Sequence, residues 1–360
     1  MRIAITTGGG DAPGLNAVIR AAVLAARARG WEVFGIRRGY SGLFQAGYGG
    51  VVVLDEAAVR GITHEGGTIL GTTSRGNPFS FQVTQPDGSV RTVDRSGEVI
   101  DRFREMGIDC LIAIGGDGSL RIARDLARRG LNVIGVPKTI DNDLDATVVT
   151  FGFHTAVQTA TDAIDKLHST AEAHERIMVV ELMGRHAGWI ALFAGLAAAA
   201  DVILIPEIPY RLDRVVEAIE ARWSRGHEYA IVVVAEGALP VGGEASYLDD
   251  HAGLKRRLGG AARLLSRQLR EHTRHETRSL VLGHLQRGGA PTAYDRIISL
   301  RFGSAAIELA ERGRFGCMVA LEPPDVKAVP LADAVRHLKT VPARGDVVRT
   351  ARAVGISFGD

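Results

Sequence analysis

The chain has 360 residues, of which 46% are hydrophobic and 23% are charged, and its 43 Lys and Arg side chains nearly balance its 41 Asp and Glu side chains. Such a composition is typical of a soluble globular protein long enough for two domains. The formal net charge of +2 excludes a strongly basic general nucleic-acid binder and a highly acidic disordered chain, so we expect function to reside in particular sites.

Cysteine usage and apolar patterning predict a cytoplasmic protein. The two cysteines, Cys110 and Cys317, are too few for a disulfide framework and suit a reducing compartment. The first seven residues are typical of a strand that leads into glycines and lack the features of a signal peptide. The apolar stretch 189–205 contains Asp201, so it predicts a buried helix followed by a strand and not a membrane span.

Short β-branched runs recur along the chain, with Ala-, Arg- and Leu-rich segments between them. The predicted strands are, in order, 2–6, 33–36, 51–54, 110–114, 133–136, 177–181, 202–205, 230–235 and 279–282, and helical spacing is clearest over 16–29, 120–129 and 155–171. Strands that alternate with helices predict an α/β fold with doubly wound parallel sheets. The Gly-containing polar stretches 74–97 and 239–260 are expected to be loops or insertions. Because open α/β sheets bind ligands where their strands end, the residues after each strand are the place to seek chemistry.

The first such segment, Gly8-Gly9-Gly10-Asp11, follows the first predicted strand. Its backbone N–H groups and the next helix could hold an anion. It matches neither the Rossmann fingerprint nor a Walker A loop, and a tight structural turn explains it about as well.

The second segment, Gly115-Gly116-Asp117-Gly118-Ser119, again joins a strand to a helix. Flexible backbone for phosphates and one carboxylate for Mg²⁺ are what a nucleotide-dependent kinase needs. The alternative is a glycine turn capped by Asp117.

The third segment, 137–144, contains Lys138-Thr139-Ile140-Asp141-Asn142-Asp143 directly after a strand. Two carboxylates at a spacing of two can divide their work, one as the base for a hydroxyl and the other on the metal or water side. Its position after the second segment favours a functional interpretation over a coincidence of turn residues.

These three segments, followed in order by 176–185, 235–237 and 282–289, resemble the blocks of the phosphofructokinase family over residues 1–320 or so. The resemblance implies two Rossmann-like domains with the active site in the cleft between them. Residues 1–150 and about 290–335 would bind the phosphoryl donor, 151–289 the sugar phosphate, and 336–360 would be a C-terminal extension. The implied reaction is the glycolytic phosphorylation of fructose 6-phosphate at its 1-hydroxyl, with ATP and Mg²⁺.

The resemblance also implies roles for individual residues on the donor side. Asp141 would take the hydroxyl proton, with Thr139 beside the transferring group and Arg75 and Arg185 neutralising its charge. Asp117 would hold Mg²⁺. The implied ATP-binding residues are Gly10, Arg75, Gly76, Gly116, Asp117, Gly118 and Ser119.

On the acceptor side, arginines suit a dianionic phosphate because the guanidinium group is planar and bidentate. The implied substrate-binding residues are Thr139, Ile140, Asp141, Arg176, Met183, Gly184, Arg185, Glu236, Arg278, His284, Leu285, Gln286 and Arg287. In the family two phosphate-binding arginines come from a neighbouring subunit, and they match Arg176 and Arg278. We therefore expect a homodimer or homotetramer.

Two positions that discriminate the phosphoryl donor in the family disagree here. Gly118 is the residue of ATP-dependent relatives, whereas Lys138 is the residue of pyrophosphate-dependent ones, and Ile122 replaces a glycine common in ATP-dependent relatives. This mixed pattern resembles a bacterial subgroup between the two donor classes. We expect ATP, because an Asp at position 118 excludes the nucleotide while an added lysine excludes nothing.

Three other functions remain open from the sequence. Pyrophosphate could replace ATP as the donor. A kinase for another acceptor would share the glycine-rich segment around Asp117, but it would not account for 183–185 or 284–289. A non-catalytic sensor of sugar phosphate or nucleotide is disfavoured because Asp117 and Asp141 are both present.

Overall fold

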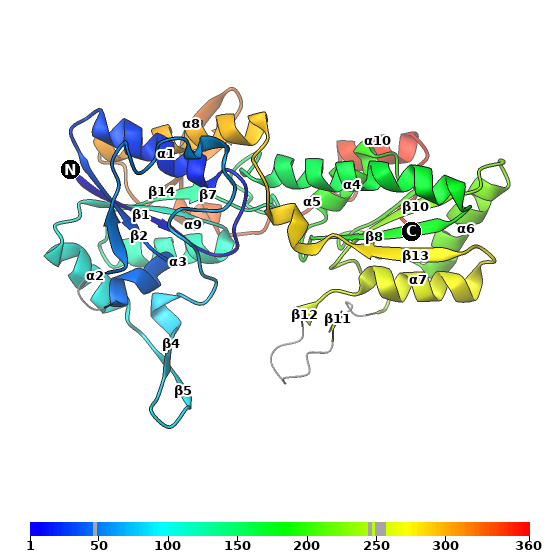
Figure 1. The fold of residues 1–360 in the computed structure, drawn as a ribbon, viewed down its shortest axis with the longest axis horizontal. Helices are drawn as coiled ribbons and strands as arrows, with labels where there is room; N and C mark the ends of the chain where they lie inside the picture. Colours follow the sequence, from blue (N-terminus) through cyan, green and yellow to red (C-terminus); the bar gives the residue numbers. More distant parts are fainter. Residues whose placement is uncertain (46–48, 244–246, 249–256) are drawn as a thin grey trace. The chain divides into compact units, whose positions relative to one another are not determined.

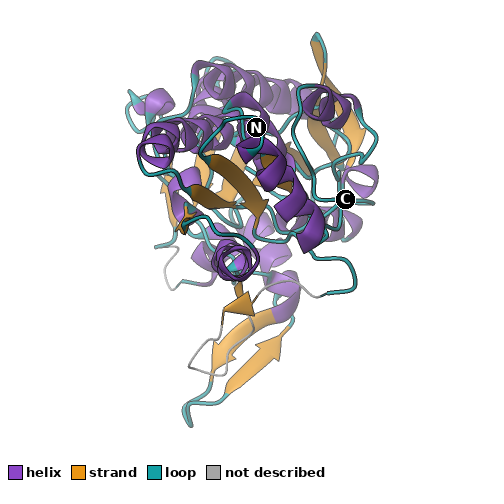
Figure 2. Ribbon diagram, turned by 90° about the vertical axis from the view of Figure 1, so that its right-hand side faces the viewer, coloured by secondary structure: helices purple, strands orange, loops and turns teal. Residues whose placement is uncertain are grey.

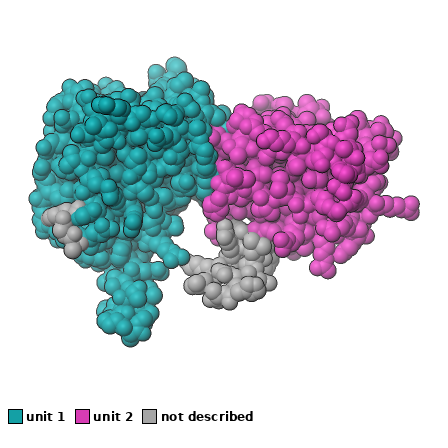
Figure 3. All heavy atoms as spheres, viewed as in Figure 1, with its two compact units in different colours: residues 1–140, 144–154, 287–338 teal, residues 141–143, 155–286, 339–360 magenta. Residues whose placement is uncertain are grey.

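The computed structural model divides into two units (Figure 3). Each unit has a β-sheet of its own. Residues 1–45, 49–243, 247–248 and 257–360 are described. Unit 1 comprises residues 1–140, 144–154 and 287–338, and unit 2 comprises 141–143, 155–286 and 339–360. Both are α/β, and the predicted fold class is confirmed. The predicted division into donor and sugar-phosphate domains, their limits and the cleft stay predictions.

Unit 1 is built on a seven-stranded sheet of order β15-β14-β7-β6-β1-β2-β3. Its helices and strands, with short 3₁₀ helices marked η, are β1 (Arg2–Thr7), α1 (Leu15–Arg27), β2 (Glu32–Ile36), η1 (Gly39–Phe44), β3 (Val51–Val53), η3 (Ile62–His64), η4 (Pro78–Ser80), β4 (Phe81–Thr84), β5 (Val90–Val93), α2 (Ser96–Glu105), β6 (Cys110–Gly115), α3 (Asp117–Arg128), β7 (Val133–Pro137), α8 (Ala293–Glu311), β14 (Cys317–Glu322), β15 (Asp325–Pro330) and α9 (Leu331–Ala334).

The centre of this sheet is parallel and covered on both faces. β6 and β7 are buried at every residue, which explains their continuous apolar sequences. α1 and α8 pack together on one face, and α2, α3 and α9 lie on the other (Figure 1). The edge strands β3 and β15 run antiparallel to their neighbours, a detail that the prediction of doubly wound parallel sheets did not include.

The stretch 74–97 is more ordered than the expected loop. It contains η4, the start of α2, and an antiparallel hairpin of β4 and β5 that stands out from the body of unit 1 (Figure 1). Two contacts hold the base of the hairpin. The Phe44 and Phe81 rings meet edge to face, and the Arg95 guanidinium lies 3.8 Å from the centre of the Phe44 ring. Strands of four mostly exposed residues carry too little apolar alternation to be distinguished from a loop by pattern.

Unit 2 is built on a parallel sheet of order β13-β8-β10-β9. Its elements are α4 (Phe153–Ala173), β8 (Ile177–Leu182), α5 (Trp189–Ala197), β9 (Val202–Leu204), α6 (Leu212–Trp223), β10 (Ala230–Ala235), β11 (Tyr247–Leu248), β12 (Arg257–Leu258), α7 (Ala261–His272), β13 (Thr277–Val281), η5 (Gly283–Arg287), which runs on to the first residue of unit 1, and α10 (Asp346–Ala353).

The strands of unit 2 also lie between two layers of helices (Figure 2). α6 and α7 share an apolar core with one face of the sheet, and α4, α5 and α10 lie on the other side (Figure 1). The apolar stretch 189–205 forms α5 and β9, as predicted. In the described parts of the chain, no helix is both long and apolar enough to cross a membrane.

Candidate active site

The glycine-rich loops of unit 1 meet where the strand order reverses, between β1 and β6. Chain connections run from β1 to β2 on one side and from β6 to β7 on the other, and in open α/β sheets the carboxyl ends of strands at such a reversal are where ligands bind. Gly8 N donates to Ile114 O at 3.0 Å and Gly9 N donates to Thr73 O at 3.1 Å. The first loop is thereby fixed to both β6 and the segment that carries Arg75.

Several of these glycines are required by close packing. A Cβ at Gly8 would lie 2.7 Å from Ser119 Oγ, and one at Gly115 would lie 2.2 Å from Ser119 Cβ. Gly118 differs, because a Cβ there would meet no atom within 4 Å. The space beside Gly118 is therefore open, which suits a position that a ligand approaches.

Asp117 is the first residue of α3, where a helix N-terminus favours negative charge. Its Oδ2 accepts a hydrogen bond from Arg121 Nε at 2.8 Å, and this bond raises the pKa of Arg121. Its Oδ1 is buried and has no hydrogen-bond partner among the described residues. An acceptor in that state is available for a cation.

The donor set around Asp117 fits Mg²⁺ rather than an all-protein metal cage. No group of three or more His, Cys, Asp or Glu side chains comes together among residues 1–45, 49–243, 247–248 and 257–360. Mg²⁺ is commonly held by one or two carboxylates together with substrate phosphates and water. A single carboxylate oxygen, buried and without a partner, fits that pattern.

Lys138 links two of the loops. Its backbone N–H donates to Gly115 O at 3.0 Å, and its Nζ donates to Gly10 O although the residue is only 3% exposed. The ammonium group of Lys138, which is predicted to influence the choice of donor, is therefore placed at the glycine loop after β1. Thr139, next in sequence, accepts from Thr150 Oγ1 through its carbonyl oxygen at 2.7 Å.

Arg75, Gly76 and Arg287 also belong to unit 1. The Arg75 side chain is exposed, while Gly76 is buried and packs where a Cβ would lie 2.8 Å from Thr73 Cγ2. Arg287 Nη1 donates to Asp11 O at 3.1 Å and lies 2.7 Å from the Cβ position of Gly10. Arg287, predicted on the sugar, is thus held against the glycine loop of the predicted donor side.

In unit 2, the predicted acceptor residues gather at the carboxyl ends of β8 and β10. Glu236 N donates to Leu182 O at 2.9 Å, and Gly237 N donates to Gly184 O at 3.1 Å. A Cβ at Gly237 would lie 2.2 Å from Arg185 O, so only glycine permits this contact. Met183, Gly184 and Arg185 are therefore held beside Glu236.

The loop after β13 joins the same cluster through Gln286. This side chain is fully buried, accepts from Met183 N through Oε1 at 3.2 Å, and donates to Gly283 O through Nε2 at 3.0 Å. It fastens η5 to the β8 loop and leaves His284 and Leu285 exposed at the same edge. Its amide is thus engaged with backbone, a positioning role that its place in the motif does not reveal.

Arg176 and Arg278 lie at the other end of the unit 2 sheet. Arg176 immediately precedes β8 and Arg278 is the second residue of β13, whereas Met183 and His284 follow those strands. A six-residue parallel strand spans roughly 20 Å, so the two arginines are a strand's length from the acceptor cluster of their own chain.

Glu276 holds both arginines. Its Oε2 accepts from Arg176 Nε at 2.9 Å and its Oε1 pairs with Arg278 Nη2. The bond from Arg176 is the largest cause that lowers the pKa of Glu276. The arginines therefore form one cationic pair around a carboxylate, and no sequence motif marks Glu276.

The predicted base, Asp141, lies in the short segment 141–143 that belongs to unit 2, whereas Thr139 and Ile140 belong to unit 1. Asn142 beside it is 5% exposed and has a φ of +51°, a left-handed conformation that asparagine tolerates better than most residues. The loop is thus fixed in an uncommon backbone shape directly beside the base.

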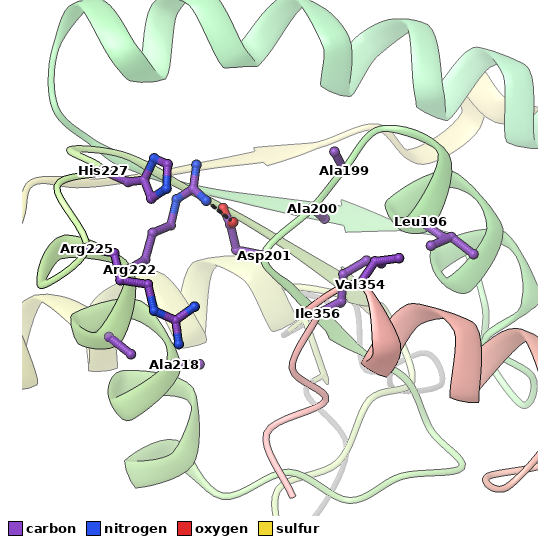
Figure 4. A pocket seen from close by; sticks show the side chains of 12 residues that line it. Leu196, Ala199, Ala200, Asp201, Ala218, Arg222, Arg225, His227, Val354 and Ile356 are labelled. Atoms are coloured by element: carbon purple, nitrogen blue, oxygen red, sulfur yellow. Dashed lines mark ion pairs between the residues drawn. The ribbon is translucent and has the colours of Figure 1, made fainter.

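Unit 2 also contains a cavity of about 430 Å³ that none of the predicted site residues lines (Figure 4). Arg222 Nη1 pairs with Asp201 Oδ1 at 2.7 Å across it, and Ile231 N donates to Asp201 Oδ2 at 2.8 Å. Burial raises the pKa of Asp201. Val354 and Ile356, close to the C-terminus, cover its apolar side (Figure 4).

Glycine-rich loops at the ends of parallel strands, with a carboxylate that is available to a cation, are typical of enzymes that transfer phosphoryl groups. Residues 2–310 match the model of the family described as phosphofructokinase. The chain belongs to the phosphofructokinase family, and it is a kinase.

Relatives of this chain extend over its whole length. The ATP-dependent 6-phosphofructokinase of Chloroflexus aurantiacus is 52% identical over 100% of this chain and 98% of its own. The ATP-dependent 6-phosphofructokinase 2 of Clostridium perfringens is 50% identical over the same shares.

Solved structures share the fold. The phosphofructokinase from Saccharomyces cerevisiae has a TM-score of 0.78 and 30% identity, and the match covers 93% of this chain and 45% of that one. The pyrophosphate-dependent phosphofructokinase from Nitrosospira multiformis has a TM-score of 0.81 at 21% identity, covering 100% of this chain and 92% of that one, so it supports the fold alone.

Proposed function

We propose that this chain transfers the γ-phosphoryl group of ATP to the 1-hydroxyl of fructose 6-phosphate and so acts in glycolysis. The observation that carries the proposal is full-length identity of 50–52% to relatives that are named ATP-dependent 6-phosphofructokinases. The open space beside Gly118 supports ATP over pyrophosphate, because a nucleotide needs room there. A cytoplasmic location is part of the proposal, in keeping with the free thiols Cys110 and Cys317.

The loops of unit 1 are proposed to bind the donor. Backbone N–H groups after β1 and at the N-terminus of α3 would hold phosphate oxygens, and the Lys138 ammonium would add positive charge. The proposed residues are Gly10, Arg75, Gly76, Gly116, Asp117, Gly118 and Ser119, with Gly118 and Lys138 setting donor preference. The contacts that tie these loops together keep them in shape before the donor arrives.

Asp117 is the residue proposed to hold Mg²⁺, through its buried Oδ1. When bound, the cation supplies charge neutralisation on the phosphate oxygens. Arg121 keeps the other carboxylate oxygen occupied at 2.8 Å, which orients Oδ1. The role of the protein here is to present one oriented anionic oxygen.

Replacing Asp117 by Asn should raise the Mg²⁺ concentration for half-maximal rate by at least about tenfold and lower kcat, because an amide binds a hard cation less well than a carboxylate. Initial rates over a Mg²⁺ titration at fixed ATP check this. Asp125→Asn is the matched control, since Asp125 lies in the same helix and pairs with Arg124. An unchanged Mg²⁺ dependence in the Asp117 variant would assign the metal to another residue.

Transfer itself needs positioning and charge stabilisation more than covalent chemistry. Asp141 is proposed to accept the proton of the 1-hydroxyl as the oxygen attacks. Thr139, Arg75 and Arg185 are proposed to stabilise charge on the moving phosphoryl group. Met183, Gly184, Glu236, Leu285, Gln286 and Arg287, with Ile140, complete the proposed sugar-binding set, and His284 is proposed to help bind the 6-phosphate.

Arg176 and Arg278 are proposed to bind the 6-phosphate of fructose 6-phosphate in a neighbouring subunit. Their distance from the acceptor cluster of the same chain, a strand's length, supports this arrangement. β13 is the edge strand of its sheet and exposes Leu280 and Val281, a surface where a second copy would pair or pack. The active form would then be at least a homodimer.

The proposed function is tested by the initial rate of fructose 1,6-bisphosphate formation from fructose 6-phosphate and Mg²⁺, with ATP and with pyrophosphate in parallel. Turnover with ATP alone supports the proposal. Turnover with pyrophosphate alone would make the chain a pyrophosphate-dependent phosphofructokinase, and binding without turnover would favour a sensor.

A further inference from the structure

Lys339 fastens the loop that carries the predicted base, although it lies beyond the residues that match the family, 2–310. Its Nζ donates to Asn142 Oδ1 at 3.0 Å, and its backbone N–H donates to Asp143 O at 2.9 Å. Both contacts lie within unit 2 and flank Asp141 on its C-terminal side. Lys339 thus contacts Asn142 and Asp143, the two residues that directly follow the predicted base.

The other side of Lys339 is anchored to the start of α5. Trp189 Nε1 donates to Lys339 O at 2.9 Å, and the Trp189 ring centre lies 5.8 Å from Lys339 Nζ. Two residues on, Val341 N donates at 2.7 Å to Glu207, whose carboxylate also accepts from Gly188 N at 3.0 Å. The segment 339–341 is therefore fixed by backbone and side-chain hydrogen bonds, which limit the movement of the Lys339 backbone.

Both anchors are close in sequence to the proposed sites. Gly188 and Trp189 follow the loop 183–185, proposed to bind the sugar, and Asn142 adjoins the proposed base. Lys339 bonds to residues in both of these regions. Asn142 has a left-handed φ of +51°, which is uncommon for a residue other than glycine, and the bond from Lys339 holds its side chain in that conformation.

We propose that Lys339 is a positioning residue for catalysis, which holds the 141–143 loop so that the Asp141 carboxylate stays aimed at the acceptor hydroxyl. This inference rests on the proposed function of Asp141. Lys339 does not touch substrate in this role. It holds the Asn142 side chain and the carbonyl group of Asp143, and so restricts movement of the loop on the C-terminal side of Asp141.

The test uses Lys339→Met, which keeps an unbranched side chain one atom shorter and removes the charge and the side-chain donor, while the backbone bond to Asp143 O remains. We expect kcat to fall by about 10- to 100-fold, because small misplacements of a reacting group cost this much, with KM values within about threefold of wild type. Lys339→Arg should recover part of kcat, since a guanidinium group also donates to Asn142 Oδ1. Lys327→Met is the control, because Lys327 is an exposed lysine of β15 that pairs with Glu322.

A double variant distinguishes positioning from general destabilisation. Asn142→Gly removes the same hydrogen bond while allowing the left-handed backbone. If Lys339 acts through Asn142, the kcat of the double variant should be little lower than the kcat of the slower single variant. The proposal is overturned if the fold-losses of kcat in the two single variants multiply in the double variant. It is also overturned if the kcat of Lys339→Met lies within about twofold of that of the Lys327→Met control.

Amide hydrogen exchange measures the clamp without turnover. In Lys339→Met, peptides covering 139–145 should exchange faster while those covering α1 stay unchanged. Unchanged exchange at 139–145 rejects the role of Lys339. Failure of the wild-type protein to phosphorylate fructose 6-phosphate with either donor rejects the proposed function instead, so the two failures are distinguishable.

Discussion

Replacing Asp141 by Asn is expected to reduce kcat by about 10²- to 10⁴-fold, the usual contribution of a general base. An amide of the same shape cannot accept the proton of the 1-hydroxyl. Fructose 6-phosphate affinity should stay within about threefold, because its phosphate is proposed to bind to Arg176 and Arg278 of a neighbouring subunit and not to Asp141. Single-turnover rates, with equilibrium binding of fructose 6-phosphate alongside, measure the two quantities separately.

Asp145 provides the matched control for this change. It is an exposed carboxylate four residues further on, so Asp145→Asn should leave both kcat and affinity near wild type. If Asp141→Asn turns over at a near-normal rate, Asp141 is not the base. Equal losses of kcat and affinity would instead indicate that the substitution disrupts the loop.

Much of the fold could be predicted because the buried strands have continuous β-branched sequences. The runs at 110–114 and 177–181 became β6 and β8, each one residue longer than predicted. The antiparallel edges β3 and β15 could not be predicted, since strand direction depends on where the chain crosses the sheet and not on local composition. The hairpin of β4 and β5 was missed because its residues are mostly exposed.

The predicted site residues sit where glycines and carboxylates follow strands, since parallel sheets bring all strand ends to one edge. Contacts between distant parts of the chain have no such local signal. Glu276 binds Arg176 and Arg278, but no sequence pattern distinguishes it from the other acidic residues. Lys339 is 197 residues from its partner Asn142, so only the folded chain reveals the contact.

Replacing Gly118 by Asp is expected to lower kcat/KM for ATP by about 10²- to 10³-fold, because like charges brought together cost several kcal/mol. Gly118 is proposed to lie beside the α-phosphate of ATP, where a carboxylate would both fill the space and repel the anion. Pyrophosphate lacks the α-phosphate that the new carboxylate would repel. Any rate that the wild type shows with pyrophosphate should therefore fall less than the rate with ATP. Steady-state rates with both donors, on wild type and variant, check the expectation.

The surroundings of Gly118 favour a change in donor binding without a change in the fold. A Cβ at that position meets no atom within 4 Å, so the first atom of the new side chain fits without displacing a neighbour. Gly118 also lies in the first turn of α3, where the helix dipole favours an acidic residue and should preserve or raise the thermal stability of the protein. Gly118→Ala adds a methyl group without charge and should retain most ATP activity. If Gly118→Asp keeps its ATP activity within about threefold, the repulsion estimate is wrong, and Lys138, held at Gly10 O, becomes the residue to vary for donor preference.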